Sequence, residues 1–142
     1  MRTFAGIIVG ILAAIAAVLA ISWIGDMLFP ADADAGLRDP EQVSASFGAA
    51  PIGAQLFLAL AWLGGAFAGG VVARRISGQS WPVLLIAGLL LLAALPLIAI
   101  VAIPTWLMVA LLAAPVIGGF LARHVTERAL APAEPETADA EV

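Results

Sequence analysis

The chain has 142 residues, 63% of them hydrophobic and only 11% charged, with a net charge of −4 at neutral pH. Soluble domains carry about 25% charged residues, so the composition excludes an ordinary soluble domain, and the length fits one domain. Cysteine is absent, which excludes disulfides and thiolate metal sites. The net charge is negative, so the chain lacks the excess of basic residues that is typical of a nucleic-acid-binding protein. Every basic residue is an arginine, and alanine is abundant. This bias indicates a GC-rich bacterial genome.

Two separate apolar segments are long enough to cross a bilayer, because a helix needs about 20 residues to span a hydrocarbon core about 30 Å thick. Residues 4–25 form the first span and residues 51–73 form the second. A secretory signal peptide is the competing interpretation of the first segment. Its apolar run, however, exceeds the roughly 7–15 residues of a signal peptide's hydrophobic region. We therefore expect an uncleaved span.

The region 81–122 contains no charged side chain. As one helix rising about 1.5 Å per residue it would extend roughly 60 Å, twice the thickness of the membrane core, so it must fold back on itself. Pro104 marks the break, because proline has no backbone N–H and disfavours helical geometry at the preceding Ile103. The third and fourth spans are then residues 82–101 and 105–123.

These patterns predict an all-α membrane protein, with four transmembrane helices in an antiparallel bundle over residues 1–130. The outer segment 26–50 contains "RDPEQ", in which Asp39 is the expected N-cap and Pro40 the first turn of a short helix on the membrane surface. The tail, residues 131–142, is rich in proline, alanine and acidic residues without apolar periodicity. We expect that tail to be disordered.

The placement of arginine predicts the orientation. Five of the six arginines fall on one side of the membrane if both termini share that side, and only Arg38 falls on the other. Because short cytoplasmic loops carry an excess of lysine and arginine, we expect both termini in the cytoplasm and the protein in a bacterial inner membrane. Arg74 and Arg75 are also candidates for an anionic lipid headgroup. The five arginines are Arg2, Arg74, Arg75, Arg123 and Arg128.

Small residues recur at four-residue intervals in the first, second and fourth spans. In lipid, helices associate through close van der Waals packing, so glycine and alanine favour contact. The alternative is a flexible gate or broken helix that lines a substrate path, but such helices usually pair the interruption with a polar group at mid-membrane. In the second span the rows are Ala61, Gly65, Gly69 and Ala73, then Gly64 and Ala68, then Ala66 and Gly70. The predicted helix-packing residues are Gly6, Gly10, Gly64, Gly65, Gly69, Gly70, Ala114 and Gly118.

Asp26 and Gln55 are the candidates for a polar site. Asp26, at the outer end of the first span, can bind a cation, relay a proton or pair with Arg38, or it simply marks the exit of the chain into water. Gln55 lies about a turn into the second span. His124 is the only histidine, which excludes a multi-histidine metal site and leaves the hydroxyl side chains without a general base for nucleophilic catalysis. The sequence predicts no catalytic residue, no cofactor and no metal.

The order of these features resembles a family of short, functionally uncharacterised four-helix bacterial membrane proteins. The pieces that carry the resemblance are "MLFP", "DPEQV", "PIGAQLFLALAWLGGAFAGGVVARRI" and "IPTWLMVALLAAPVIGGFLA", within about residues 1–123. In such sequences the end of the first span often carries Glu and His before the proline, where this chain has only Asp26. The resemblance implies the four-helix membrane fold and brings no known activity.

Three classes of function remain. The leading one is a non-enzymatic integral membrane protein, an accessory subunit or a self-associating bundle, whose partners are the lipid bilayer and another membrane protein or a second copy. The second is a small transporter or channel for an ion or an apolar solute, with Asp26 and Gln55 near its outer mouth. The third, a membrane enzyme, has the least support because catalytic groups are missing. No nucleic-acid partner is expected.

Overall fold

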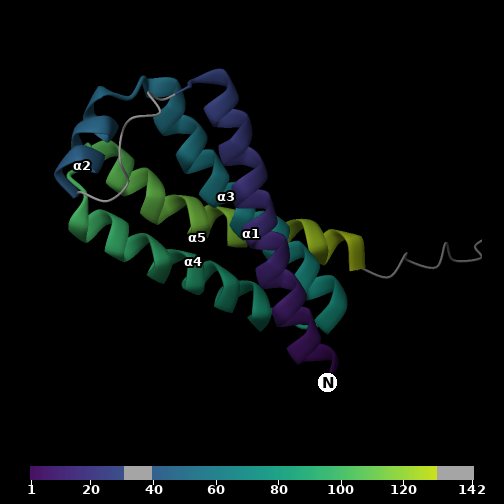
Figure 1. Ribbon diagram of the computed structural model, residues 1–142. Helices are drawn as coiled ribbons and strands as arrows, with labels where there is room; N and C mark the ends of the chain where they lie inside the picture. The colour runs from purple at the N-terminus through teal and green to yellow at the C-terminus, as the bar shows by residue number, and fades with distance from the viewer. Residues whose placement is uncertain (31–39, 131–142) are drawn as a thin grey trace, which may run out of the picture.

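Residues 1–30 and 40–130 are described by a computed structural model, and all regular structure within these ranges is helical (Figure 1). The predicted N-cap Asp39 and the predicted disordered tail 131–142 lie outside the described residues. The helices are α1 (Arg2–Leu28), α2 (Pro40–Ala49), α3 (Ile52–Ser77), α4 (Trp81–Ile100) and α5 (Thr105–Leu130).

Four of these helices, α1, α3, α4 and α5, are long and apolar enough to cross a membrane. They coincide with the four predicted spans, and they indicate a multi-pass membrane protein. The short helix α2 begins at Pro40, as the "RDPEQ" motif predicts. The long helices extend past the predicted spans at several ends because hydropathy marks the apolar core of a bilayer, whereas backbone hydrogen bonding continues until a residue stops it.

Local features of the chain account for the ends of the helices. Gly78 ends α3 in the left-handed conformation with a φ of 71°, and its N–H donates to the carbonyl oxygen of Arg74 at 2.8 Å. Glycine adopts this conformation without a Cβ clash. Between α4 and α5 the helical pattern breaks at residues 101–104, and Pro104 accounts for the interruption because it restricts the residue before it.

Helix α3 is the centre of the bundle: it packs against α1, α5 and α4. Figure 1 shows α1 crossing α3, and α1 also contacts α4, where Ile86 lies beside Gly10. Along the α1–α3 contact, early residues of α1 meet late residues of α3. Gly6 lies beside Ala73 and Ser77, whereas Gly25 lies beside Phe57.

Helix α2 lies against the turn between α4 and α5. The hydroxyl of Ser44 accepts a hydrogen bond of 3.0 Å from the backbone N–H of Ala102. The buried side chains of Val101 and Ile103 in that turn, with Leu107 and Leu111 of α5, form a cluster against which Trp62 of α3 packs. This cluster joins α5 to the first half of α3, so the short helix and the turn close one end of the bundle.

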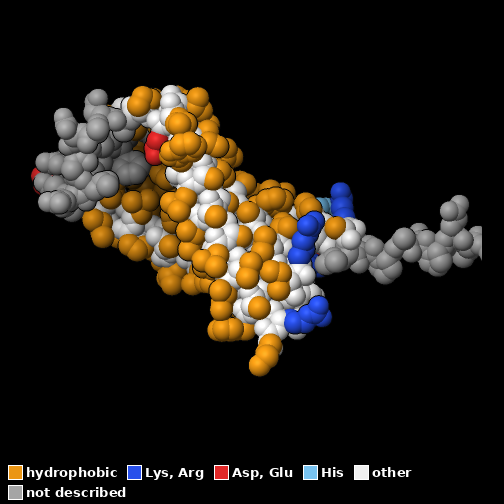
Figure 2. All heavy atoms as spheres, turned by 45° about the vertical axis from the view of Figure 1, so that its right-hand side comes forward, with side chains coloured by type: hydrophobic (Ala, Val, Ile, Leu, Met, Phe, Trp, Pro, Cys, Tyr) orange, Lys and Arg blue, Asp and Glu red, His pale blue; other side chains and the backbone are white. Residues whose placement is uncertain are grey.

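The two ends of the bundle differ in charge. We call one the arginine end, where α1 and α4 begin and α3 and α5 finish, and the other the α2 end. Every arginine among the described residues belongs to the arginine end, and Figure 2 shows their blue side chains together beyond the apolar surface. The five are Arg2, Arg74, Arg75, Arg123 and Arg128.

Candidate functional site

The closest helix contact joins α1 and α3 through glycine and alanine. A Cβ placed on Gly10 would lie 2.8 Å from the Cβ of Ala73 and 2.9 Å from the carbonyl oxygen of Gly69. A Cβ on Gly69 would in turn lie 2.7 Å from the Cβ of Ala14. No real Cβ has neighbours this near, so the backbones touch where side chains would otherwise separate them. Such contact is the main source of helix affinity in lipid.

The contact between α1 and α3 continues at Gly65 of α3 and at Gly6 of α1. A Cβ on Gly65 would lie 3.1 Å from the carbonyl oxygen of Ala14, and a Cβ on Gly6 would lie 3.0 Å from that of Ala73. Gly64 faces the side chain of Ile21 on α1. Five of the predicted packing residues therefore lie along one continuous contact between α1 and α3: Gly6, Gly10, Gly64, Gly65 and Gly69.

A second contact joins α3 to α5. A Cβ on Gly70 would lie 2.9 Å from the Cβ of Ala122, and one on Gly118 would lie 2.9 Å from the Cβ of Ala66. Ala114, one turn before Gly118, is also buried. The row Ala66 and Gly70 thus belongs to a different face of α3 from the row Gly65 and Gly69, so α3 uses separate glycine rows for its two neighbours.

Two glycines of the α1–α3 contact lie outside the predicted set. A Cβ on Gly25 would lie 3.0 Å from the Cβ of Phe57, and Gly53 lies under the ring of Phe29. The two phenylalanine rings are tilted against each other with centroids 6.0 Å apart. Neither glycine belongs to a four-residue row of small residues, so the spacing gave no signal for them.

Arg74 is turned into the bundle rather than toward a headgroup. It is 8% exposed, and its Nη1 donates to the backbone carbonyl oxygen of Arg123 on α5 at 3.0 Å. Its neighbour Arg75 is exposed. The two arginines were expected to have the same role, but only Arg75 is exposed at the surface. A signal existed, because Arg74 follows Gly70 by four residues and therefore lies on the face of α3 that contacts α5.

Glu127 completes a polar cluster around Arg74, which we call the Arg74 cluster: Arg74, Arg123, Thr126 and Glu127. The Oε1 atom of Glu127 accepts from Nε of Arg123 at 2.8 Å and lies 3.5 Å from Nη1 of Arg74. The buried hydroxyl of Thr126 donates to the carbonyl oxygen of Ala122 at 2.7 Å. Two guanidinium groups thus share one carboxylate, which leaves a net positive charge.

Asp26 and Gln55 belong to the α2 end. Asp26 is exposed in the last turn of α1. Gln55 is buried, and its Nε2 donates to the carbonyl oxygen of Ala50 at 3.1 Å. That hydrogen bond fixes the segment that precedes α3, so Gln55 has a structural role. Within the described residues no group of three or more His, Cys, Asp or Glu side chains is placed to hold a metal ion.

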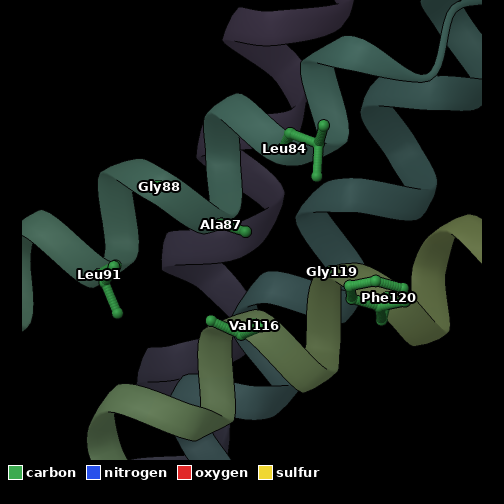
Figure 3. Close-up of a pocket in the computed structure, with 7 residues that line it drawn as sticks. All are labelled: Leu84, Ala87, Gly88, Leu91, Val116, Gly119 and Phe120. Atoms are coloured by element: carbon green, nitrogen blue, oxygen red, sulfur yellow. The ribbon is translucent and has the colours of Figure 1, made fainter.

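An apolar groove of about 170 Å³ lies on the surface between α4 and α5 (Figure 3). Its base is formed by residues with little or no side chain: a Cβ on Gly119 would lie 3.0 Å from the Cβ of Ala87. A Cβ on Gly88 would meet nothing within 4 Å, so space remains above it. We call this feature the α4–α5 groove. It is lined by Leu84, Ala87, Gly88, Leu91, Val116, Gly119 and Phe120.

The fold and the contacts define a class: an all-helical protein whose four apolar helices indicate a multi-pass membrane protein. No protein-family model matches the chain, and neither a curated protein nor a solved structure is similar to it. The resemblance to four-helix bacterial membrane proteins stays a prediction.

Proposed function

We propose that the protein is a non-enzymatic integral membrane protein that acts through helix contacts, as a self-associating bundle or as an accessory subunit of another membrane protein. The observation that carries the proposal is the backbone-to-backbone packing of α1 on α3. At Gly10 and Gly69 the space between these helices is filled by backbone and alanine atoms and by the side chain of Ile86 from α4. A contact of this kind fixes two helices against each other, which is the property expected of a structural bundle.

We favour this function over that of a transporter because of the positions of the polar groups. A transport path near the membrane centre is usually formed where helices are interrupted and polar groups face a cavity. Here α3 is continuous through its glycines, and these glycines contact neighbouring helices. Asp26 and Gln55 lie at the α2 end, and Gln55 is bonded to the Ala50 carbonyl.

The proposed setting is a bacterial inner membrane, with the helices crossing in alternating directions as an antiparallel bundle and both termini in the cytoplasm. The grouping of the described arginines at one end of the helices supports this orientation (Figure 2), because basic residues accumulate on the cytoplasmic side. The pairing of Gly6 with Ser77 and of Gly25 with Phe57 supports opposite directions for α1 and α3.

Purification in a mild detergent tests the proposal. We expect a particle whose protein mass is a multiple of 14.4 kDa, or a complex with one partner protein at fixed stoichiometry that survives a second purification step. The control is the same measurement on the Gly10→Val variant, in which the α1–α3 packing is disturbed. A lone monomer that conducts ions in reconstituted vesicles, with a flux abolished by Asp26→Asn, would overturn the proposal in favour of a transporter.

A further inference from the structure

The α4–α5 groove points along the helices toward a charged side chain, Arg123, and an aromatic one, Trp81, at the arginine end. On α5, Val116, Gly119 and Arg123 are spaced by three and four residues, so they share one face of the helix. On α4, Trp81 precedes Leu84 by three residues and lies on the same face as the groove wall. The groove therefore leads from the apolar surface toward Arg123 on one helix and Trp81 on the other.

Arg123 is available to an external anion. Its side chain is 49% exposed, and its Nε donates to Glu127. Its two terminal nitrogens make no hydrogen bond within residues 1–30 and 40–130. The buried guanidinium of Arg74 donates to the Arg123 carbonyl, and its Nε has no partner among the same residues. With two cations against one carboxylate, the Arg74 cluster, to which Arg123 belongs, carries a positive charge.

Trp81 indicates that this mouth lies at the level of lipid headgroups. It is 48% exposed at the start of α4, and its indole N–H donates to Oε1 of Gln79 at 2.6 Å. Tryptophan concentrates at the boundary between the apolar core and the headgroups, where the ring is in an apolar environment and the N–H meets polar atoms. The groove begins one turn inside that boundary.

We propose that the α4–α5 groove binds one acyl chain of an anionic phospholipid whose phosphate is held by Arg123. Guanidinium groups pair with phosphate through two parallel hydrogen bonds, and basic sites between membrane helices are suited to anionic headgroups. The inference goes beyond the proposed function and requires only that the four helices lie in a bilayer.

The shape of the groove favours a lipid chain over the helix of a second copy. Its walls include Leu84 and Phe120, which are 58% and 67% exposed and project outward from its glycine and alanine base. A helix with side chains is about 10 Å wide, so a second helix would meet these walls before it reached Gly88. An unbranched acyl chain has no side chains and is much narrower than a helix, so it can reach the base.

Native mass spectrometry with two lipids of identical acyl chains tests the headgroup contact. We expect phosphatidylglycerol to form a one-to-one adduct at lower concentration than phosphatidylcholine, because the choline ammonium of the latter offsets the charge of its phosphate. Arg123→Gln should reduce this preference about fivefold, the contribution of one arginine beside an anionic headgroup. The matched control is Arg128→Gln, which removes the same charge from the same helix end, five residues on and outside the groove face. Equal losses in the two variants would overturn the assignment to Arg123.

A second pair of variants tests the groove itself. Gly88→Leu fills the open space above Gly88, whereas Gly88→Ala removes the glycine but leaves most of that space. We expect the leucine variant to lose the adducts of both lipids and the alanine variant to keep them, with the oligomeric mass the same in both. Retention of both lipids by Gly88→Leu would overturn the proposal. A change in the oligomeric mass of Gly88→Leu with its lipid adducts intact would also overturn the proposal, because the groove would then be a contact between copies.

Discussion

The guanidinium of Arg74 on α3 donates to the main-chain carbonyl oxygen of Arg123 on α5 at 3.0 Å. Forty-nine residues separate the two in sequence, so the bond joins helices that are not consecutive. Gly70, one turn before Arg74, contacts Ala122. The small residue brings the helices close enough for the arginine to reach the α5 backbone, and apolar packing and polar bonding therefore act on the same helix pair.

Arg74→Ala should weaken this pair. The substitution removes the hydrogen bond to the Arg123 carbonyl and leaves Glu127 with one cation, so we expect the free energy of unfolding to fall by about 1–3 kcal/mol. Arg75→Ala is the control, because the adjacent side chain is exposed and should change stability by no more than about 0.5 kcal/mol. Unfolding by titration with sodium dodecyl sulfate, followed by circular dichroism, measures both. Equal losses would contradict a structural role for Arg74.

Gly10→Val should disrupt the packing of α1 on α3. The new Cβ would lie 2.8 Å from that of Ala73, so the helices must separate, at a cost of about 1–3 kcal/mol for an overpacked contact. Gly88→Val adds the same side chain at a helical position with nothing within 4 Å of the new Cβ, and it controls for helix propensity. The same titration compares the two. If Gly88→Val is destabilised as much as Gly10→Val, close approach is not what makes Gly10 important.

The positions of the spans were predictable because they depend on segment length and on one proline. The region 81–122 is too long for a single crossing, and Pro104 is the residue that breaks it; α4 ends at Ile100 and α5 begins at Thr105. The end of α5 at Leu130 was also predictable, because the sequence past the apolar span places Arg123 and Glu127 four residues apart, as a helix that continues to about Leu130 requires.

The partners of the small residues were not predictable in the same way. Four-residue spacing indicates that Gly65 and Gly69 share a face, but it carries no information on which helix that face meets. The inward turn of Arg74 was missed because a charge at the end of a span was interpreted as a topology marker. Extending the row of Ala66 and Gly70 by four residues reaches Arg74, so the local pattern contained the direction of its side chain.

An engineered disulfide tests the direction of α1 relative to α3. A Cβ on Gly6 would lie 3.1 Å from the Cβ of Ser77, slightly closer than the roughly 3.5–4.5 Å of a disulfide. Because the chain has no cysteine of its own, Gly6→Cys with Ser77→Cys creates one pair only. Mild oxidation should give a faster-migrating monomer on a non-reducing gel.

The control for this crosslink is Gly6→Cys with Gly53→Cys. Gly53 faces Phe29 at the α2 end, the full length of α1 away from Gly6, so no intramolecular crosslink should form. Crosslinking in the control but not in the first variant would mean that α1 and α3 run in the same direction.

Labelling of single cysteines tests which end faces the cytoplasm. Gln79→Cys places an exposed thiol in the turn between α3 and α4 at the arginine end, and Ala49→Cys places one in α2 at the opposite end. Positive residues are retained on the cytoplasmic side during insertion. A maleimide that cannot cross the inner membrane should therefore label Ala49→Cys in intact cells and Gln79→Cys only after that membrane is disrupted. The reverse pattern would put the arginine end outside and remove the basis of the proposed orientation. Labelling of both positions in intact cells would contradict a bundle whose two ends lie on opposite sides of the membrane.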